Sequence, residues 1–158
     1  MPVSGTLWPI LVTFFTSMLP GLELRAGIPA GVALGLDTPT AVVVAVLGNI
    51  LQIAGALVVI EWAYRQCTRI PLLNRWLTTA EGTVGPYRTW IRRYGWLGLA
   101  LFVSLPLPGS GIWGGTVLAR LLQVSAPGLW LGLSLGVAGA GIVMGLLTEG
   151  AFTIFRLF

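Results

Sequence analysis

The feature that most constrains this chain is an unbroken apolar stretch from Thr40 to Ile60, TAVVVAVLGNILQIAGALVVI. As an α-helix rising about 1.5 Å per residue, this stretch is long enough to cross a hydrocarbon core of roughly 30 Å. A second such stretch runs from Leu129 to Leu147. Hydrophobic residues make up 56% of the chain and charged residues 9%, against roughly 45–50% and about 25% in soluble domains. We therefore predict an all-α integral membrane protein with both stretches as transmembrane helices.

Two pairs of shorter apolar segments fill much of the remaining sequence, and proline and glycine interrupt each pair. The pairs are Pro9–Met18 with Gly27–Leu36, and Gly95–Leu105 with Gly111–Leu122. Each segment is about half as long as a span requires, so we predict two re-entrant hairpins, each followed by one transmembrane helix. Broken helices at membrane depth must be buried in protein or line a cavity, and in transporters such breaks mark the substrate site.

The two halves of the chain also align with each other. Several residues recur in order 88 positions later, namely Pro39, Gly48 and Glu61 as Pro127, Gly136 and Glu149. We predict one membrane domain over 1–158, which consists of repeat 1 (1–62), a linker (63–94) and repeat 2 (95–158).

The arginines predict the orientation of these repeats. Six of the nine lie between Arg65 and Arg93, and the positive-inside rule places this segment in the cytoplasm. The hairpins would then enter a cytoplasmic membrane from opposite sides, as inverted repeats whose tips meet near the midplane. The linker also carries aromatic and apolar residues at helical spacing, which predicts an interfacial amphipathic helix with Tyr87, Trp90, Ile91 and Tyr94 on one face. Such a helix would serve as a membrane anchor or, alternatively, as a headgroup sensor that gates access.

Composition excludes several classes of function. The chain has no histidine and one cysteine, Cys67, so His-based catalysis, His-ligated metals and an intrachain disulfide are ruled out. We expect no enzyme, no cofactor and no metal site. The arginines flank spans and are explained by topology, so we expect no nucleic-acid partner.

Glu23 and Arg25 lie in the first interruption, in otherwise apolar sequence. A charge at membrane depth costs at least about 2.5–3.5 kcal/mol, so such charges pair, face a cavity and serve function. Arg25 offers five fixed donors that suit a phosphate or carboxylate, and Glu23 could exchange a proton. The alternative is a structural ion pair that pins the hairpin.

The second interruption reads PLPGSGIWGG, from Pro106 to Gly115. Gly109, Ser110 and Gly111 precede a half-helix whose first amides would be unpaired and could bind an anion; alternatively, the glycines only form a tight reversal. With their neighbours, the candidate substrate-binding residues are Glu23, Arg25, Gly27, Pro29, Asn49, Pro106, Pro108, Gly109, Ser110, Gly111 and Trp113.

Two further patterns favour helix packing. Asn49 and Gln52 share a helix face with small residues, which indicates close packing with an interhelical hydrogen bond or, for Asn49, a place along the substrate path. The second span has glycines at intervals of four, at Gly128, Gly132 and Gly136 and again at Gly141 and Gly145. This spacing favours packing within the chain or between protomers.

Three stretches, ELRAGIPAGVALG (Glu23–Gly35), GN (Gly48-Asn49) and PLPGSGIWGG, resemble the putative small multidrug export family, which is similar to the DedA or VTT-domain superfamily. The resemblance implies two re-entrant hairpins with inverted symmetry. For DedA relatives it implies lipid scrambling or flipping, including recycling of polyprenyl phosphate carriers, with embedded acidic and arginine residues. Glu23 and Arg25 match that requirement, whereas the second hairpin has no arginine before Arg120.

We therefore expect a multi-pass transporter of the cytoplasmic membrane that moves an amphipathic anion, specifically a lipid-linked phosphate. It would act in contact with membrane lipids and with protons as a coupling ion. One alternative is export of cationic or amphipathic drugs, with Glu23 as the substrate carboxylate. Another is a non-transporting scaffold or assembly factor that uses the glycine-rich span as its partner surface. Because the predicted elements enclose little volume, we expect a homodimer.

Overall fold

The structure, a computed structural model, describes residues 4–69, 71, 88–106 and 110–157. Within these ranges every regular element is an α-helix and there is no strand, so the all-α prediction is confirmed. In chain order the helices are α1 (Ser4–Ser17), α2 (Glu23–Ala33), α3 (Thr38–Arg69), α5 (Arg88–Ser104), α6 (Ile112–Leu121) and α7 (Ala126–Leu157).

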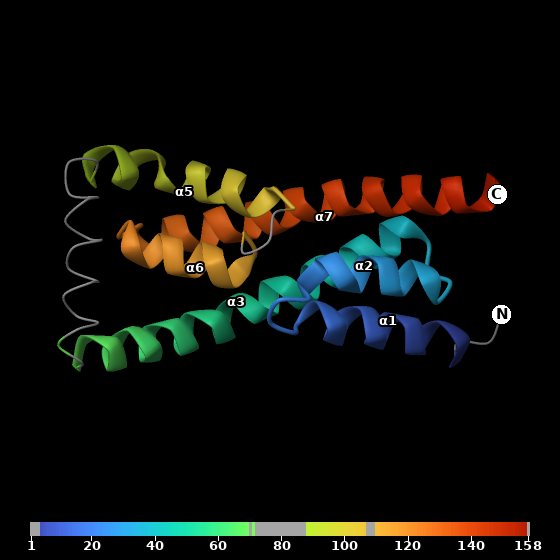
Figure 1. Cartoon of the computed structure of the whole chain (residues 1–158), viewed down its shortest axis with the longest axis horizontal. Coiled ribbons are helices and arrows are strands. Elements are labelled where there is room, and N and C mark those ends of the chain that lie inside the picture. Colours follow the sequence, from blue (N-terminus) through green and yellow to red (C-terminus); the bar gives the residue numbers. More distant parts are fainter. Residues whose placement is uncertain (1–3, 70, 72–87, 107–109, 158) are drawn as a thin grey trace.

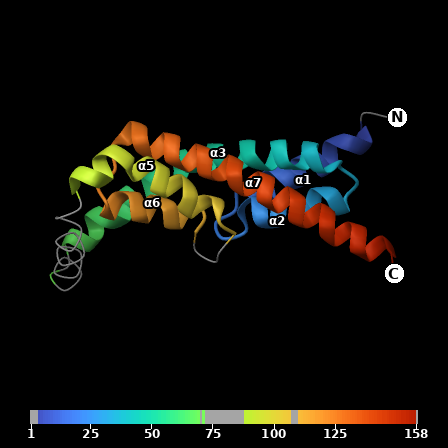
Figure 2. The ribbon, with the colours of Figure 1, turned by 90° about the horizontal axis from the view of Figure 1, so that it is seen from above.

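The helices α3 and α7 are long and apolar enough to cross a membrane. They contain the two predicted spans, and Figure 2 shows them crossing near the middle of the molecule. Both are longer than predicted, and α3 enters the segment that we assigned to the linker over 63–94. Its polar end remains helical because side chains one turn apart bind each other, as Arg65 does to Glu61 (3.1 Å) and Arg69 to Gln66 (3.4 Å). The predicted amphipathic helix with Trp90, Ile91 and Tyr94 coincides with the first turns of α5, and Tyr87 lies outside the described residues.

The short helices form two pairs, α1 with α2 and α5 with α6, and Figure 1 shows the pairs at opposite ends of the molecule. Each pair turns back near mid-length, so the α1–α2 turn faces the start of α6. The first turn is shorter than predicted, because Pro20 and the left-handed Gly21 (φ +83°) complete the reversal by residue 22. As a correction, Glu23 and Arg25 therefore lie in the first turn of α2 rather than in a loop before it.

Glycines permit close contact between neighbouring helices. A Cβ on Gly132 would lie 2.7 Å from the carbonyl oxygen of Trp96, and one on Gly136 would lie 2.6 Å from Cβ of Val103 on α5. Further along α7, Gly141 and Gly145 lie against valines of α3. The glycine spacing of α7 is therefore used for packing within the chain.

Asp37 caps α3. Its Oδ2 accepts a hydrogen bond from the backbone N–H of Thr40 at 3.1 Å, and this bond lowers the pKa of the Asp37 carboxyl below its usual value. A group whose pKa is lowered on folding stabilises the fold above its unfolded pKa of about 3.9, and this contribution is lost as the pH falls through the folded pKa.

The cap predicts a difference in acid stability between wild type and Asp37→Asn. Asparagine also caps helices but does not titrate. Between about pH 6 and about pH 2.5, we expect the melting temperature of the wild type in detergent to fall further than that of the variant. An identical pH dependence of the two melting temperatures would contradict the charged cap.

Candidate functional site

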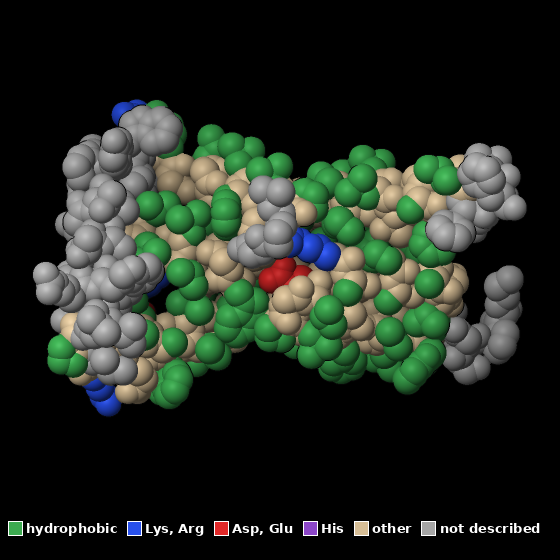
Figure 3. Space-filling view, in the orientation of Figure 1, with side chains coloured by type: hydrophobic (Ala, Val, Ile, Leu, Met, Phe, Trp, Pro, Cys, Tyr) green, Lys and Arg blue, Asp and Glu red, His purple; other side chains and the backbone are tan. Residues whose placement is uncertain are grey.

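The α1–α2 turn meets the start of α6 near mid-length, and polar side chains gather there. Figure 3 shows an acidic and a basic patch side by side at this level, on a surface that is otherwise largely apolar. The chemistry of this contact is carried by Glu23 and Arg25, which project from the first turn of α2.

Glu23 joins the two helix pairs. Its side chain is buried, with 6% exposed, and its carboxylate accepts a hydrogen bond of 3.1 Å from the backbone N–H of Ile112, the first residue of α6. The next amide, that of Trp113, also interacts with this carboxylate. The first N–H groups of a helix have no partner within the helix and carry the positive end of its dipole. The carboxylate of Glu23 therefore fills the anion-binding end of α6.

Gly111 leaves the room that this contact requires. A Cβ at this position would collide with both carboxylate oxygens of Glu23. Gly111 is buried and has an extended backbone (φ −74°, ψ −164°) that any residue can adopt. The absence of a side chain, rather than backbone freedom, is therefore what the site needs here.

The backbone of Glu23 adopts a left-handed conformation with φ +51°. For a residue with a side chain this conformation costs roughly 1–2 kcal/mol. Such strained residues persist only where surrounding contacts fix them, and they cluster at functional sites. The strain at Glu23 coincides with its burial against α6, which marks this residue as the centre of the site.

Arg25 makes the second link between the pairs. Its Nη2 donates to Oγ of Ser110 at 2.7 Å and to the carbonyl oxygen of Leu105 at 3.3 Å. The Ser110 hydroxyl, which is 1% exposed, donates in turn to the same carbonyl. One turn of α2 thus binds both sides of the α5–α6 connection.

The remaining predicted residues of the first half lie close by. Gly27 is buried where α2 crosses α1, and a Cβ there would collide with Ser17, so its role is packing. Pro29 lies inside α2, where it removes one backbone donor. Asn49 is 1% exposed and belongs to the buried face of α3.

Helix register places Asn49 at the level of Glu23. Gly31 of α2 lies against Ala41 of the antiparallel α3. Glu23 lies eight residues before Gly31 and Asn49 lies eight residues after Ala41, so the two residues are at the same level of the helix pair. Oδ1 of Asn49 has no hydrogen-bond partner among the described residues, and neither do the amide atoms of Gln52 or Nε1 of Trp113. Buried polar atoms without a protein partner call for an explanation such as water or a ligand, and the substrate-path interpretation of Asn49 stays a prediction.

In the second half, Ser110, Gly111 and Trp113 lie at the contact, and Pro106 is exposed at its edge. Pro108 and Gly109 lie outside the described residues. The amides that the sequence assigns to a substrate anion are occupied by Glu23 itself.

Sequence reasoning missed a second polar cluster, between Glu61 on α3 and Arg120 on α6. Arg120 Nε donates to Glu61 Oε2 at 3.2 Å, and its guanidinium lies 4.0 Å from the ring centroid of Tyr64. From the sequence alone, Glu61 is interpreted as an ordinary carboxylate at the end of a transmembrane span. No spacing rule links residues 59 positions apart on different helices, so only the packing of α6 on α3 reveals this pair.

A family model described as "Putative small multi-drug export protein" matches residues 23–143 of the chain. The match starts at Glu23, the first residue of α2, and includes Arg25 and the start of α6. No curated protein and no solved structure gives a significant match.

Proposed function

Because the chain belongs to the putative small multi-drug export protein family, whose description indicates a membrane transporter, we propose that it moves an amphipathic anion across the cytoplasmic membrane. A lipid-linked phosphate is the substrate class that suits the site best. The family match does not extend to the DedA superfamily, so that relationship and its flippase activity remain part of the proposal.

The proposed architecture is an inverted repeat. The α1–α2 and α5–α6 pairs act as re-entrant hairpins that enter the bilayer from opposite sides, and α3 and α7 cross it. This arrangement is supported by the contact of the first turn of α2 with the start of α6 near mid-length. It is also supported by Figure 1, where the start of α1 and the end of α7 lie at one end of the molecule and the end of α3, with Arg65 and Arg69, lies at the other. The arginine-rich end faces the cytoplasm.

The observation that carries the proposal is the carboxylate of Glu23 on the first amide of α6. A phosphate or carboxylate of a substrate could bind the unpaired amides at the start of a helix in the same way as this side chain. Arg25 and the Ser110 hydroxyl lie at the same contact, 2.7 Å apart, and supply the charge and donors that a phosphate also needs. Glu23 thus acts as an internal anion that holds the site in the absence of substrate.

Exchange of anions gives a route to proton coupling. When Glu23 takes up a proton, its negative charge is removed and its hold on the α6 amides weakens. A substrate anion can then occupy the amides and Arg25, and its departure lets Glu23 lose the proton and return. One proton on Glu23 therefore accompanies one substrate anion.

The experiment measures movement of a fluorescent polyprenyl phosphate analogue in proteoliposomes, with and without a pH gradient. Arg25→Leu should lower the rate at least about tenfold, because a charge-assisted contact worth roughly 1.5–3 kcal/mol is lost. Glu23→Gln should retain slow movement that no longer responds to the gradient. Arg93→Leu, which removes an exposed arginine on α5, is the matched control. An unchanged rate in Arg25→Leu would remove the anion site from the mechanism.

Export of cationic drugs is the second candidate, and the family description favours it. In that version Glu23 binds the substrate cation directly. Competition between drug and protons would then be lost in Glu23→Gln and kept in Arg25→Leu. An anion carrier, in contrast, would lose activity in Arg25→Leu. The carboxylate of Glu23 already accepts a hydrogen bond from the backbone N–H of Ile112. We therefore favour transport of an anion over binding of a drug cation by Glu23.

A scaffold without transport is favoured less. The glycines of α7 that it would use as a partner surface are occupied by α5 and α3. Homodimerisation remains part of the transport proposal, since large apolar side chains on the outer faces of α3 and α7 stay exposed to lipid or to a second copy.

A further inference from the structure

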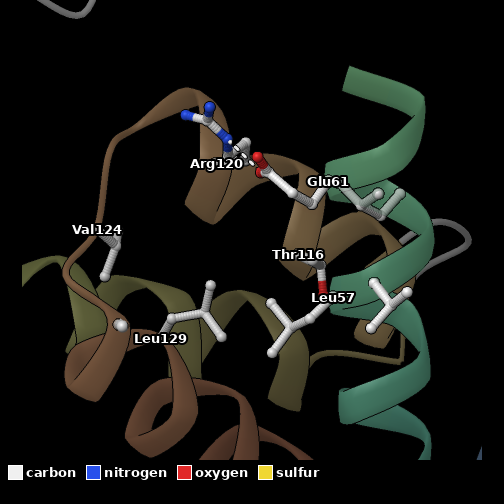
Figure 4. A pocket seen from close by; sticks show the side chains of 9 residues that line it. Leu57, Glu61, Thr116, Arg120, Val124 and Leu129 are labelled. Atoms are coloured by element: carbon white, nitrogen blue, oxygen red, sulfur yellow. Dashed lines mark hydrogen bonds and ion pairs between the residues drawn. The ribbon is translucent and has the colours of Figure 1, made fainter. Parts of the chain in front are cut away.

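A pocket of about 420 Å³ lies between α3, α6 and the beginning of α7, and it begins one turn along α6 from the Glu23 contact, at Thr116. Figure 4 shows Leu57, Val124 and Leu129 around its interior and the Glu61–Arg120 pair at its rim. Its lining residues are mostly apolar, namely Leu57, Val58, Ile60, Glu61, Thr116, Arg120, Val124, Ala126 and Leu129. The hydroxyl of Thr116 already donates to the carbonyl of Ile112. The interior therefore suits an apolar group of ligand size.

The rim of the pocket carries net positive charge. Glu61 has both oxygens in use, Oε1 with Nε of Arg65 (3.1 Å) and Oε2 with Nε of Arg120 (3.2 Å). Two arginines against one carboxylate leave a local charge of +1, and a further cation would find no carboxylate oxygen without a partner.

Arg120 is held in a position to receive an anion. The Glu61 contact fixes its Nε and the Tyr64 ring lies against its guanidinium. Figure 4 shows its two terminal nitrogens directed away from Glu61, and among the described residues they have no hydrogen-bond partner. A planar guanidinium with two unused terminal nitrogens fits a phosphate in a bidentate manner.

We propose that this pocket is a binding site for an anionic phospholipid, with the phosphate on Arg120 beside Arg65 and part of an acyl chain between α3 and α7. The site is separate from the transport site, because Glu61 lies twelve residues beyond Asn49 on α3, or roughly 18 Å along the helix. Lipid binding here links α6 to α3 and does not require the proposed transport. A zwitterionic lipid lacks the net charge that the rim favours, and free phosphate lacks the chain.

The test compares the detergent-purified protein with added phosphatidylglycerol, phosphatidylcholine or inorganic phosphate, by melting temperature and by native mass spectrometry of bound lipid. We expect phosphatidylglycerol alone to bind and to raise the melting temperature, since a ligand of the folded state stabilises it. Arg120→Gln should weaken this binding about tenfold or more. Arg93→Gln, with the same loss of charge at an exposed position on α5, should bind like the wild type.

A second variant tests the acyl chain. Val124→Trp fills the pocket and keeps both arginines, so phosphatidylglycerol should lose its effect while the lipid-free protein still melts cooperatively. The proposal is overturned by equal effects of phosphatidylglycerol and phosphatidylcholine, or by unchanged affinity in either Arg120→Gln or Val124→Trp. Stabilisation by inorganic phosphate alone would assign the arginines to a free anion and overturn the lipid site.

Discussion

Replacing Gly48 with alanine is expected to destabilise the protein by about 1–3 kcal/mol, the usual cost of an added methyl group in a packed interior. A Cβ at this position would lie 2.7 Å from the carbonyl oxygen of Phe14 and 3.3 Å from Cβ of Ser17. The carbonyl cannot rotate away, because it accepts the N–H of Met18 at 3.2 Å at the end of α1. The extra methyl would therefore push α1 away from α3 and disturb the turn that precedes Glu23.

Gly55→Ala is the matched control for this change. Gly55 lies two turns further along the same helix, and a Cβ there would have no neighbour within 4 Å. Alanine is a better helix former than glycine by up to about 1 kcal/mol, so Gly55→Ala should be neutral or stabilising. Thermal unfolding of both variants in one detergent measures the difference. Equal melting temperatures would mean that α1 does not pack on α3 at Gly48.

The sequence predicted the two long helices well, because an apolar run longer than a bilayer is thick has few alternatives. It predicted their ends less well. Beyond Ile60, α3 continues through Glu61, Arg65 and Arg69, where hydropathy no longer indicates a span but side-chain pairs one turn apart still stabilise a helix.

The start of α2 was also misplaced. From the sequence alone, the charged pair is expected in a turn. However, an acidic residue is favourable in the first turn of a helix, because it interacts with the positive end of the helix dipole. Glu23 is such a residue, and this signal was available in the sequence.

For the site, the sequence identified the two charged residues and the Ser110-Gly111 segment before α6, which the first turn of α2 contacts. It could not show that Glu23 itself binds the amides of α6, since that contact joins residues 89 positions apart. The free backbone donors at a helix start are predictable, whereas the group that fills them depends on how the pairs are placed in space. The same limit explains why Arg120 and Glu61 were not paired.

Replacing Gly111 with alanine is expected to remove the carboxylate of Glu23 from the start of α6 and to abolish proton-dependent transport. The added methyl group would collide with both carboxylate oxygens, so the side chain must leave the amide of Ile112. A buried acceptor that loses its partner costs about 1–3 kcal/mol, and this cost should appear as a lower melting temperature. Gly98→Ala on α5, where a Cβ meets nothing within 4 Å, is the control.

A double-mutant cycle separates this contact from a general packing defect. If the carboxylate of Glu23 is the group that alanine displaces, Gly111→Ala should cost little in a Glu23→Ala background, because no carboxylate remains to collide. The two single changes should then be strongly non-additive, with an interaction energy of roughly 1–3 kcal/mol, as expected for residues in direct contact. Additive losses of stability would show that the methyl group at 111 acts on other neighbours. In that case Glu23 would not be the internal anion that holds α6, and the proposed exchange with a substrate would lose its basis.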